Sequence, residues 1–320
     1  ALAGKEYCMG KIVWLCLFFY PALTAAQGEP KVIYRGIILS GGVGSKPLLQ
    51  PLGLDVDPRG NLYLADTGHH RVLKCNPAGE LLREVGGFGF HKEQFDRPVD
   101  VWAGNGLEVF IADYNNQRVE RYDKDLNYLS SFYSDELMAL SLQFGYPAAV
   151  RLSTQGELFV ADHEFNRILR FDTFGVPKSS FGDYNWGEGQ LARPAKMLIT
   201  GRREIFVSDS TADAIVEFDA YGNFVRRFGK GILRDPGGIA LWPRLQNRHD
   251  VAAIVVADRG NHRLVVFNRE GEVLLTRGTR GPLPEQFDSP TAVATHGNRI
   301  FVLDTGNHRV QVFEVQQAVE

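Results

Sequence analysis

The chain has 320 residues, of which 44% are hydrophobic and 23% are charged, so it can build an ordinary globular core and is not expected to be disordered. The formal net charge of −3 disfavours a dedicated nucleic-acid binder, because such proteins neutralise phosphates with an excess of basic residues. The 34 glycines indicate many tight turns between short strands.

The first residues have the features of a secretory signal peptide. Lys11 precedes an apolar run at 12–19, and small residues end at Ala26, the order of parts found in such peptides. The run is too short to span a membrane, which takes about 20 apolar residues. We therefore expect residues 1–26 to be the signal-peptide region and 27–320 the mature domain, secreted or periplasmic. The alternative is a hydrophobic N-terminal helix that packs on the domain.

Cleavage after Ala26 would leave Cys75 as the single cysteine of the mature chain. One cysteine forms no internal disulfide, and it is most often a small buried hydrophobe. The chain also lacks the closely spaced cysteines that a RING or zinc-ribbon module needs.

One phrase, Ala-Asp followed after four residues by Arg, recurs along the chain. It is marked by aspartates at intervals of 46 to 49 residues: Asp66, Asp113, Asp162, Asp209, Asp258 and Asp304. A proline opens each unit: Pro51, Pro98, Pro147, Pro194, Pro236 and Pro290. The fourth copy is degenerate, with Ala214 at the place of the arginine. A period of 40–50 residues with short strands indicates a propeller or a related array.

Each unit contains four strand patterns separated by Gly, Pro and Asn turns, which predicts a four-stranded antiparallel blade. The last unit ends after its third strand, at 310–315, while residues 32–42 form a strand pattern outside any unit. The fold class we predict is therefore all-β. It is a six-bladed β-propeller of four-stranded antiparallel blades, closed by an N-terminal strand that completes the last blade. Closure removes the exposed edges that an open array would leave.

The repeated phrase, together with a Gln-Phe or Gln-Leu pair before several opening prolines, resembles the NHL repeat. Three such pairs are Gln94-Phe95, Gln190-Leu191 and Gln286-Phe287. The resemblance covers about residues 36–315 and implies the propeller fold. It implies less about function, because this fold hosts lyases, lactonases, ligand binders and protein-binding modules.

In each unit the Asp ends the second strand and the Arg begins the third. The pairs are Asp66/Arg71, Asp113/Arg118, Asp162/Arg167, Asp258/Arg263 and Asp304/Arg309. We expect them to be structural, since Asp accepts turn amides and Arg bridges carboxylates and carbonyls. His70, His262 and His308 precede three of these arginines and are expected to be turn residues.

A metal-dependent enzyme is the alternative that the resemblance keeps open. The amidating lyase of this fold has zinc-binding histidines after the proline that opens a blade. Here no histidine occupies either of the two positions after any of the six opening prolines. Lactonases of this fold need converging oxygen ligands, and Asp100 is the only carboxylate at these positions. We predict no metal and no cofactor. Asp100 and Lys196 are expected at the channel mouth, as a polar pair or as two unrelated solvated side chains.

The loops between blades are long and aromatic at 86–97, 130–146 and 181–193. Aromatic side chains on loops held by a rigid scaffold are common recognition elements. The candidate binding residues are Phe88, His91, Tyr133, Tyr184 and Trp186. The alternative is that these loops pack onto their own blades. An insertion at 242–250 in the fifth unit is expected on the opposite face.

These observations predict an exported, monomeric, non-catalytic binding or scaffold protein for a protein, peptide or glycan partner. We expect no nucleic-acid partner and no membrane span after signal cleavage. The alternative is a channel-centred, metal-dependent enzyme, similar to the amidating lyase or to a lactonase. A role as a ubiquitin-ligase substrate adaptor is disfavoured, because the chain lacks a RING and carries an export signal.

Overall fold

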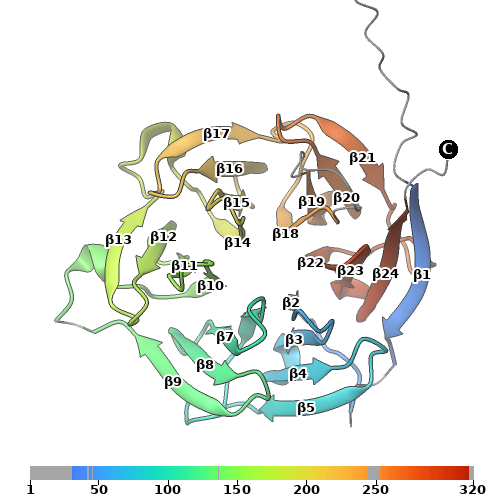
Figure 1. The fold of residues 1–320 in the computed structure, drawn as a ribbon, viewed down its shortest axis with the longest axis horizontal. Coiled ribbons are helices and arrows are strands. Elements are labelled where there is room, and N and C mark those ends of the chain that lie inside the picture. The colour runs from blue at the N-terminus through green and yellow to red at the C-terminus, as the bar shows by residue number, and fades with distance from the viewer. Residues whose placement is uncertain (1–30, 42, 45, 136, 244–252, 317–320) are drawn as a thin grey trace, which may run out of the picture.

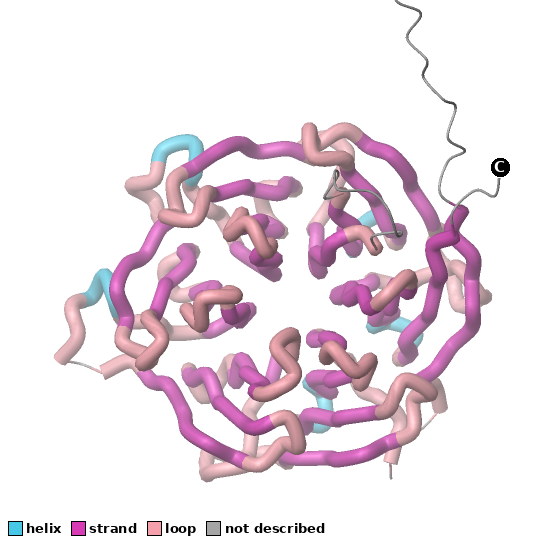
Figure 2. Tube along the Cα trace, in the orientation of Figure 1, coloured by secondary structure: helices cyan, strands magenta, loops and turns pink. Residues whose placement is uncertain are grey.

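The computed structural model describes residues 31–316, apart from positions 42, 45, 136 and 244–252. The expected signal peptide, 1–26, and most of the insertion at 242–250 lie outside the described residues. Figure 2 shows that strands and loops make up almost the whole ring, with single helical turns in a few connections. Within the described part of the chain, no helix is long and apolar enough to cross a membrane.

The strands form six four-stranded antiparallel sheets, each of which is one blade. The first blade consists of β2 (Gly53–Val56), β3 (Leu62–Asp66), β4 (Arg71–Cys75) and β5 (Leu81–Gly86). The second consists of β6 (Pro98–Trp102), β7 (Glu108–Asp113), β8 (Arg118–Asp123) and β9 (Tyr128–Tyr133). The third consists of β10 (Pro147–Leu152), β11 (Leu158–Asp162), β12 (Arg167–Phe171) and β13 (Pro177–Phe181). The fourth consists of β14 (Pro194–Ile199), β15 (Ile205–Asp209), β16 (Ala214–Phe218) and β17 (Phe224–Phe228). The fifth consists of β18 (Pro236–Leu241), β19 (Ile254–Asp258), β20 (Arg263–Phe267) and β21 (Val273–Arg277). The sixth consists of β22 (Pro290–His296), β23 (Arg299–Asp304), β24 (Arg309–Gln316) and β1 (Lys31–Leu39).

Short 3₁₀ helices occupy some of the connections. Three lie in turns between a second and a third strand: η1 (Thr67–His69), η4 (Arg259–Asn261) and η5 (Thr305–Asn307). Two lie in loops between blades: η2 (Leu140–Leu142) and η3 (Gly187–Gly189).

The blades surround a central axis, with the first strand of each repeat unit innermost (Figure 1). The predicted six-bladed, all-β propeller is confirmed. So is its closure: β1 pairs antiparallel with β24, from Lys31 opposite Gln316 to Leu39 opposite Val310. The sixth sheet therefore has the order β1-β24-β23-β22, and the two ends of the described chain share one blade.

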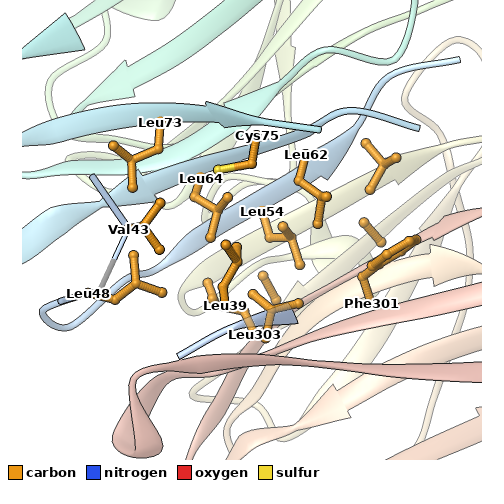
Figure 3. Close-up of a cluster of buried hydrophobic side chains, with 14 of the residues drawn as sticks. Leu39, Val43, Leu48, Leu54, Leu62, Leu64, Leu73, Cys75, Phe301 and Leu303 are labelled. Carbon is orange, nitrogen blue, oxygen red and sulfur yellow. The ribbon is translucent and has the colours of Figure 1, made fainter. Parts of the chain in front are cut away.

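Apolar side chains fill the space between neighbouring blades. Figure 3 shows this core at the closure seam, where Leu39 of β1 packs among Leu54, Leu64 and Leu303 of the first and sixth blades. Cys75 lies in the same cluster and is fully buried, as expected of a small hydrophobe. Burial of this apolar surface is the main favourable contribution to the stability of the fold.

The repeated Asp–Arg pairs hold each loop between blades onto the blade that follows it. All six repeat aspartates are buried, and each accepts one or more backbone amides from its incoming loop; the distance from Leu49 N to Asp66 Oδ1, for example, is 2.7 Å. Arg118 donates Nε to Asp113 at 2.8 Å and its other nitrogens to loop carbonyls, among them that of Gln94. The pairs lie in the scaffold, as the sequence predicted.

The fourth blade replaces the missing arginine with one from another strand. Asp209 still accepts the amides of Ala192 and Arg193, but position 214 is alanine. Arg227 of β17 donates to the carbonyl of Gln190 at 2.5 Å, the contact that Arg118 makes with Gln94 in the second blade. Arg227 thus keeps the contact with the loop carbonyl but does not replace the ion pair with the repeat aspartate.

Candidate functional site

A depression of about 920 Å³ opens over the axis. Its walls come from the turns between second and third strands and from residues that directly precede the opening prolines, including His70, Arg97, Asp235, His262 and His308. We call this depression, together with the smaller pocket beneath it, the axial mouth. The face that carries it is the mouth face; the turns between first and second strands lie on the opposite face.

The smaller pocket has a volume of about 140 Å³ and shares five lining residues with the depression above it. Its floor contains the residue that directly follows each opening proline: Leu52, Val99, Ala148, Ala195, Gly237 and Thr291. These residues are small or apolar, so the floor offers a hydrophobic surface beneath a polar rim.

Asp100 and Lys196 form a buried ion pair across the channel. The distance from Lys196 Nζ to Asp100 Oδ1 is 2.7 Å, and Arg151 Nη1 lies 2.6 Å from Asp100 Oδ2. Lys196 also donates to the carbonyl of Val99 at 2.7 Å. Of the two alternatives, the polar pair is therefore the one observed.

The Asp100 network connects three blades, since its members lie on β6, β10 and β14. Burial opposes ionisation of Asp100, but Arg151 and Lys196 outweigh it and hold the pKa of its carboxyl below the ordinary value. Asp100, Lys196 and Arg151 are all paired within this network, so its role is structural: it joins the second, third and fourth blades.

Three histidines connect neighbouring blades at the rim. His70, His262 and His308 are left-handed turn residues with φ of 55°, 55° and 52°. Their Nδ1 atoms accept backbone amides from the next blade's incoming loop: Arg97 N at 3.0 Å, Ser289 N at 3.0 Å and Gln50 N at 3.4 Å. An amide donor at Nδ1 leaves the proton of a neutral imidazole on Nε2. They are turn residues, as predicted, and they also line the mouth.

The wall between the second and fourth blades combines two arginines with an aromatic pair. The Arg97 guanidinium lies 5.3 Å from the ring centre of Tyr114, and the Tyr114 hydroxyl lies 3.2 Å from His163 Nδ1. His163 Nε2 lies 2.9 Å from the carbonyl of Pro194, next to Arg193 in the same pocket. Burial, followed by the positive charge of Arg193, lowers the pKa of His163 to about 4.

The structure places the predicted aromatic residues in different surroundings. Phe88 is 70% exposed, and its ring centre lies 5.0 Å from that of His70, so it borders the mouth. Tyr184 is 78% exposed and projects from the loop at 181–193. Trp186 is half-buried and packs against the apolar core between the third and fourth blades. It donates Nε1 to the carbonyl of Gly222 at 3.0 Å.

Tyr133 and His91 are exposed and both contact Arg118. The hydroxyl of Tyr133 lies 3.4 Å from Arg118 Nη1, and the carbonyl of His91 accepts Nη2 at 3.2 Å. Four of the five predicted residues lie in the loops at 86–97 and 181–193, and Tyr133 ends strand β9. Phe88 contacts His70, a residue that lines the mouth.

Among the described residues, no three His, Cys, Asp or Glu side chains converge closely enough to hold a metal ion. The residues that sequence reasoning missed are Arg97, Arg193 and Asp235. Each directly precedes an opening proline, and the residue at that position differs from unit to unit. That variation against a regular background was the signal that could have identified them.

Comparison with known proteins gives matches to one repeat family. The family model named NHL repeat matches residues 48–75 and 287–313. NHL repeat-containing protein 2 of Gallus gallus is 31% identical over 114 residues, which is 30% of this chain and 16% of that protein. E3 ubiquitin-protein ligase NHLRC1 of Homo sapiens is 24% identical over 301 residues, which is 86% of this chain and 69% of that protein. The match thus spans less than a fifth of the chicken protein.

Solved structures share the fold at low sequence identity. A streptogramin B lyase aligns with a TM-score of 0.61 and 10% identity, covering 89% of this chain and 98% of that one. An auxiliary nutrient binding protein from Bacteroides ovatus aligns with a TM-score of 0.66 and 13% identity, covering 90% and 78%. One of these proteins is named a lyase and the other a binding protein, so the shared fold does not decide between catalysis and binding.

Proposed function

Because this chain belongs to the NHL-repeat family, we propose that it is a non-catalytic binding protein that holds a protein or peptide partner on its mouth face. The observation that carries the proposal is the axial mouth: an open depression of about 920 Å³ with a small, largely apolar floor and a polar rim. Concave sites of this size with a few placed polar groups are the usual ligand sites of proteins.

The state of the charged groups favours binding over catalysis. A general acid or base needs a proton-transfer group that is free to reach a substrate. Asp100 and Lys196 are instead satisfied by each other, by Arg151 and by backbone groups. The absence of a converging metal-ligand set among the described residues gives the metal-dependent alternative no support either.

The loop at 86–97 extends the proposed surface from the axis outwards. Phe88 borders the mouth through His70, and Arg97 at the end of the loop lines the mouth itself. We propose Tyr133, Tyr184 and Trp186 as further contacts of a larger partner at the rim. Exposed aromatic rings also suit a glycan, so a glycan array belongs in the test.

The test is a display selection of peptides on the purified chain, with the glycan array in parallel. We expect ligands whose affinity falls at least tenfold in Phe88→Ala, as for an interface anchor, and is unchanged in Leu107→Ala. Leu107 is the matched control because it is 69% exposed, against 70% for Phe88, and lies in a turn of the opposite face. Ligands that respond to Leu107→Ala and not to Phe88→Ala contradict the proposed face. One tightly bound metal ion per chain would favour the enzyme instead.

We also propose that the chain is exported. The support is the pattern of Lys11, the apolar run at 12–19 and the small residues up to Ala26. Expression of the full chain in a secreting host should give a product that begins at Gln27, as determined by N-terminal sequencing. Leu17→Arg places a charge in the apolar run and should abolish export. Retention of the unprocessed chain inside the cell in both forms would contradict the proposal.

A further inference from the structure

We propose that the axial mouth recognises an acidic peptide segment, whose carboxylates are held by Arg97 and Arg193 while a small or apolar side chain enters the pocket between them. This inference rests on the proposed function and specifies its partner. Both arginines line the smaller pocket, and Arg97 also lines the depression above it.

Both guanidinium groups are free to bind a ligand. Neither forms an ion pair or a side-chain hydrogen bond within the described part of the chain, whereas Arg259 at the same rim is paired with Asp235. The Arg97 contact with the Tyr114 ring, at 5.3 Å, uses the face of the guanidinium and leaves its N–H edges available. An arginine fork of this kind fits the two oxygens of a carboxylate.

The backbones of both arginines are fixed, which reduces the entropy that binding has to overcome. The amide of Arg97 donates to His70 Nδ1 at 3.0 Å, and its carbonyl accepts Tyr114 N at 3.2 Å. The amide of Arg193 donates to Asp209 at 2.9 Å, and its carbonyl accepts Ser210 N at 3.0 Å. Each arginine is therefore held on a rigid turn and directs only its side chain toward the mouth.

Positive charge is concentrated here although the whole chain carries a formal charge of −3. The smaller pocket is lined by Arg97, Arg193, Lys196 and Arg259, against the single carboxylate Asp235. Of these cations, Lys196 and Arg259 are neutralised by Asp100 and Asp235. The excess positive charge of the pocket therefore comes from the two unpaired arginines. Their electric field is strengthened because the concave protein wall around them has a low dielectric constant.

The lowered pKa of His163 reflects the same arginines, in addition to burial. After burial, its largest cause is Arg193, and Lys196 and Arg97 act in the same direction. A neutral imidazole between the two arginines adds no third cation. It also keeps Tyr114 in place, since their rings lie 5.7 Å apart and the hydroxyl contacts Nδ1.

The surroundings favour a peptide over a nucleic acid. Asp96 lies on the rim of the depression and would repel a continuous phosphate backbone. The apolar floor with its pocket of about 140 Å³ is suited to a single side chain. A peptide that carries two carboxylates around one apolar residue satisfies the arginines and the floor and keeps its other residues outside.

The test uses two libraries of fluorescein-labelled heptapeptides, measured by fluorescence anisotropy on the full chain. One library has Glu on both sides of a randomised central residue, and the other has Gln at the same two places. We expect the Glu library to bind at least tenfold more tightly, the usual size of a charge-assisted contact. Arg97→Gln and Arg193→Gln should each weaken the Glu library about tenfold, and the double variant should bind both libraries equally.

Arg202→Gln is the matched control, because Arg202 is an exposed arginine in the turn between β14 and β15 on the opposite face. It should leave binding of the Glu library unchanged. Arg97→Lys should recover part of the affinity, since a lysine keeps the charge and loses the fork. Thermal melts of all variants check that the exposed substitutions leave the fold intact.

Three results would overturn the inference. Equal binding of the two libraries does so, as does a loss in Arg202→Gln equal to that in Arg193→Gln. The third is tighter binding of a labelled oligouridylate than of the Glu library, which would indicate nucleic acid. If the libraries bind equally and Phe88→Ala still weakens them, only this inference fails. If no mouth-face variant changes binding of any ligand, the proposed function fails with it.

Discussion

In the second blade, Nη2 of Arg118 lies 2.8 Å from Oε1 of Glu120, and both side chains are almost completely buried. The same guanidinium donates Nε to Asp113 at 2.8 Å. One buried cation therefore serves two buried carboxylates, and Glu120 receives a further hydrogen bond from the Tyr122 hydroxyl. Burial raises the pKa of Glu120 to about 7 and that of Asp113 to about 6, because one cation does not offset both desolvation costs.

No other blade places a carboxylate at the position of Glu120. The residues two places after the third strand begins are Leu73, Leu169, Val216, Val265 and Gln311. Four of the five are apolar, and the fifth is a neutral amide that the fold accommodates fully buried. The second blade therefore carries a pH-sensitive group in its scaffold, next to the loop at 86–97.

We predict that Glu120→Gln stabilises the protein above pH 7. The pKa of Glu120 is raised in the folded state, so its favourable contribution is present below about pH 4.5 and is lost as pH rises through about 7. At pH 8 the variant should gain roughly 3 kcal/mol in the free energy of unfolding, because the pKa of Glu120 is raised from 4.5 to about 7 and each pKa unit corresponds to about 1.4 kcal/mol. Urea unfolding at pH 5 and pH 8 measures the difference. Glu270→Gln, at an exposed position, is the control; an unchanged pH slope in Glu120→Gln would refute the assignment.

We predict the opposite pH dependence for Asp100. Arg151 and Lys196 lower its pKa in the folded state, so its stabilising effect is present above the ordinary carboxyl pKa and is lost as pH falls through the folded value. Asp100→Asn leaves the buried Lys196 and the partly buried Arg151 without their carboxylate and should cost about 3 kcal/mol at pH 7. The variant should also lose less stability on acidification than the parent protein, as followed by denaturant unfolding from pH 7 to pH 3. Full stability at pH 7 would show that the network does not hold the blades together.

The mouth itself gives a prediction for nuclear magnetic resonance. His163 should remain neutral until about pH 4, because burial and neighbouring cations oppose its protonation. Arg193→Gln removes the nearest of these cations and should raise the pKa of His163 by about 0.5 unit. Arg202→Gln, on the opposite face, should leave it unchanged. Imidazole ¹⁵N shifts report both values directly. Equal effects of the two substitutions would mean that Arg193 does not act on the mouth.

The sequence predicted the parts of this fold that the repeats encode. Asp113 and Arg118 recur in register, so their pairing followed from their spacing, and the missing fourth strand of the last unit required residues 32–39 to close the ring. The mouth was harder to predict. Arg97 and Arg193 lie one residue before an opening proline, where the repeat imposes no residue type.

Contacts across the ring were also outside the reach of sequence reasoning. Asp100 and Lys196 are 96 residues apart, and only the curvature of the ring brings them to 2.7 Å. Trp186 is a second case in which the sequence did not predict a contact. A tryptophan in a loop suggests a surface anchor, but its indole donates to the carbonyl of Gly222 in a neighbouring turn and is half-buried there. The local sequence pattern specifies each blade, whereas contacts between distant blades depend on how the six blades close into a ring.

The closure seam provides a prediction with an internal control. Leu39 and Ile37 are aliphatic residues of the same strand, β1, but Leu39 is 2% exposed in the seam core and Ile37 is 37% exposed. Leu39→Ala should destabilise the protein by about 2–5 kcal/mol, the range for large-to-small substitutions in a core. Ile37→Ala should cost less than about 1 kcal/mol, since it removes little buried surface. Chemical denaturation of the two variants under the same conditions gives the comparison. If both substitutions cost the same, β1 adds an edge strand to the sixth blade without contributing to the core that joins it to the first.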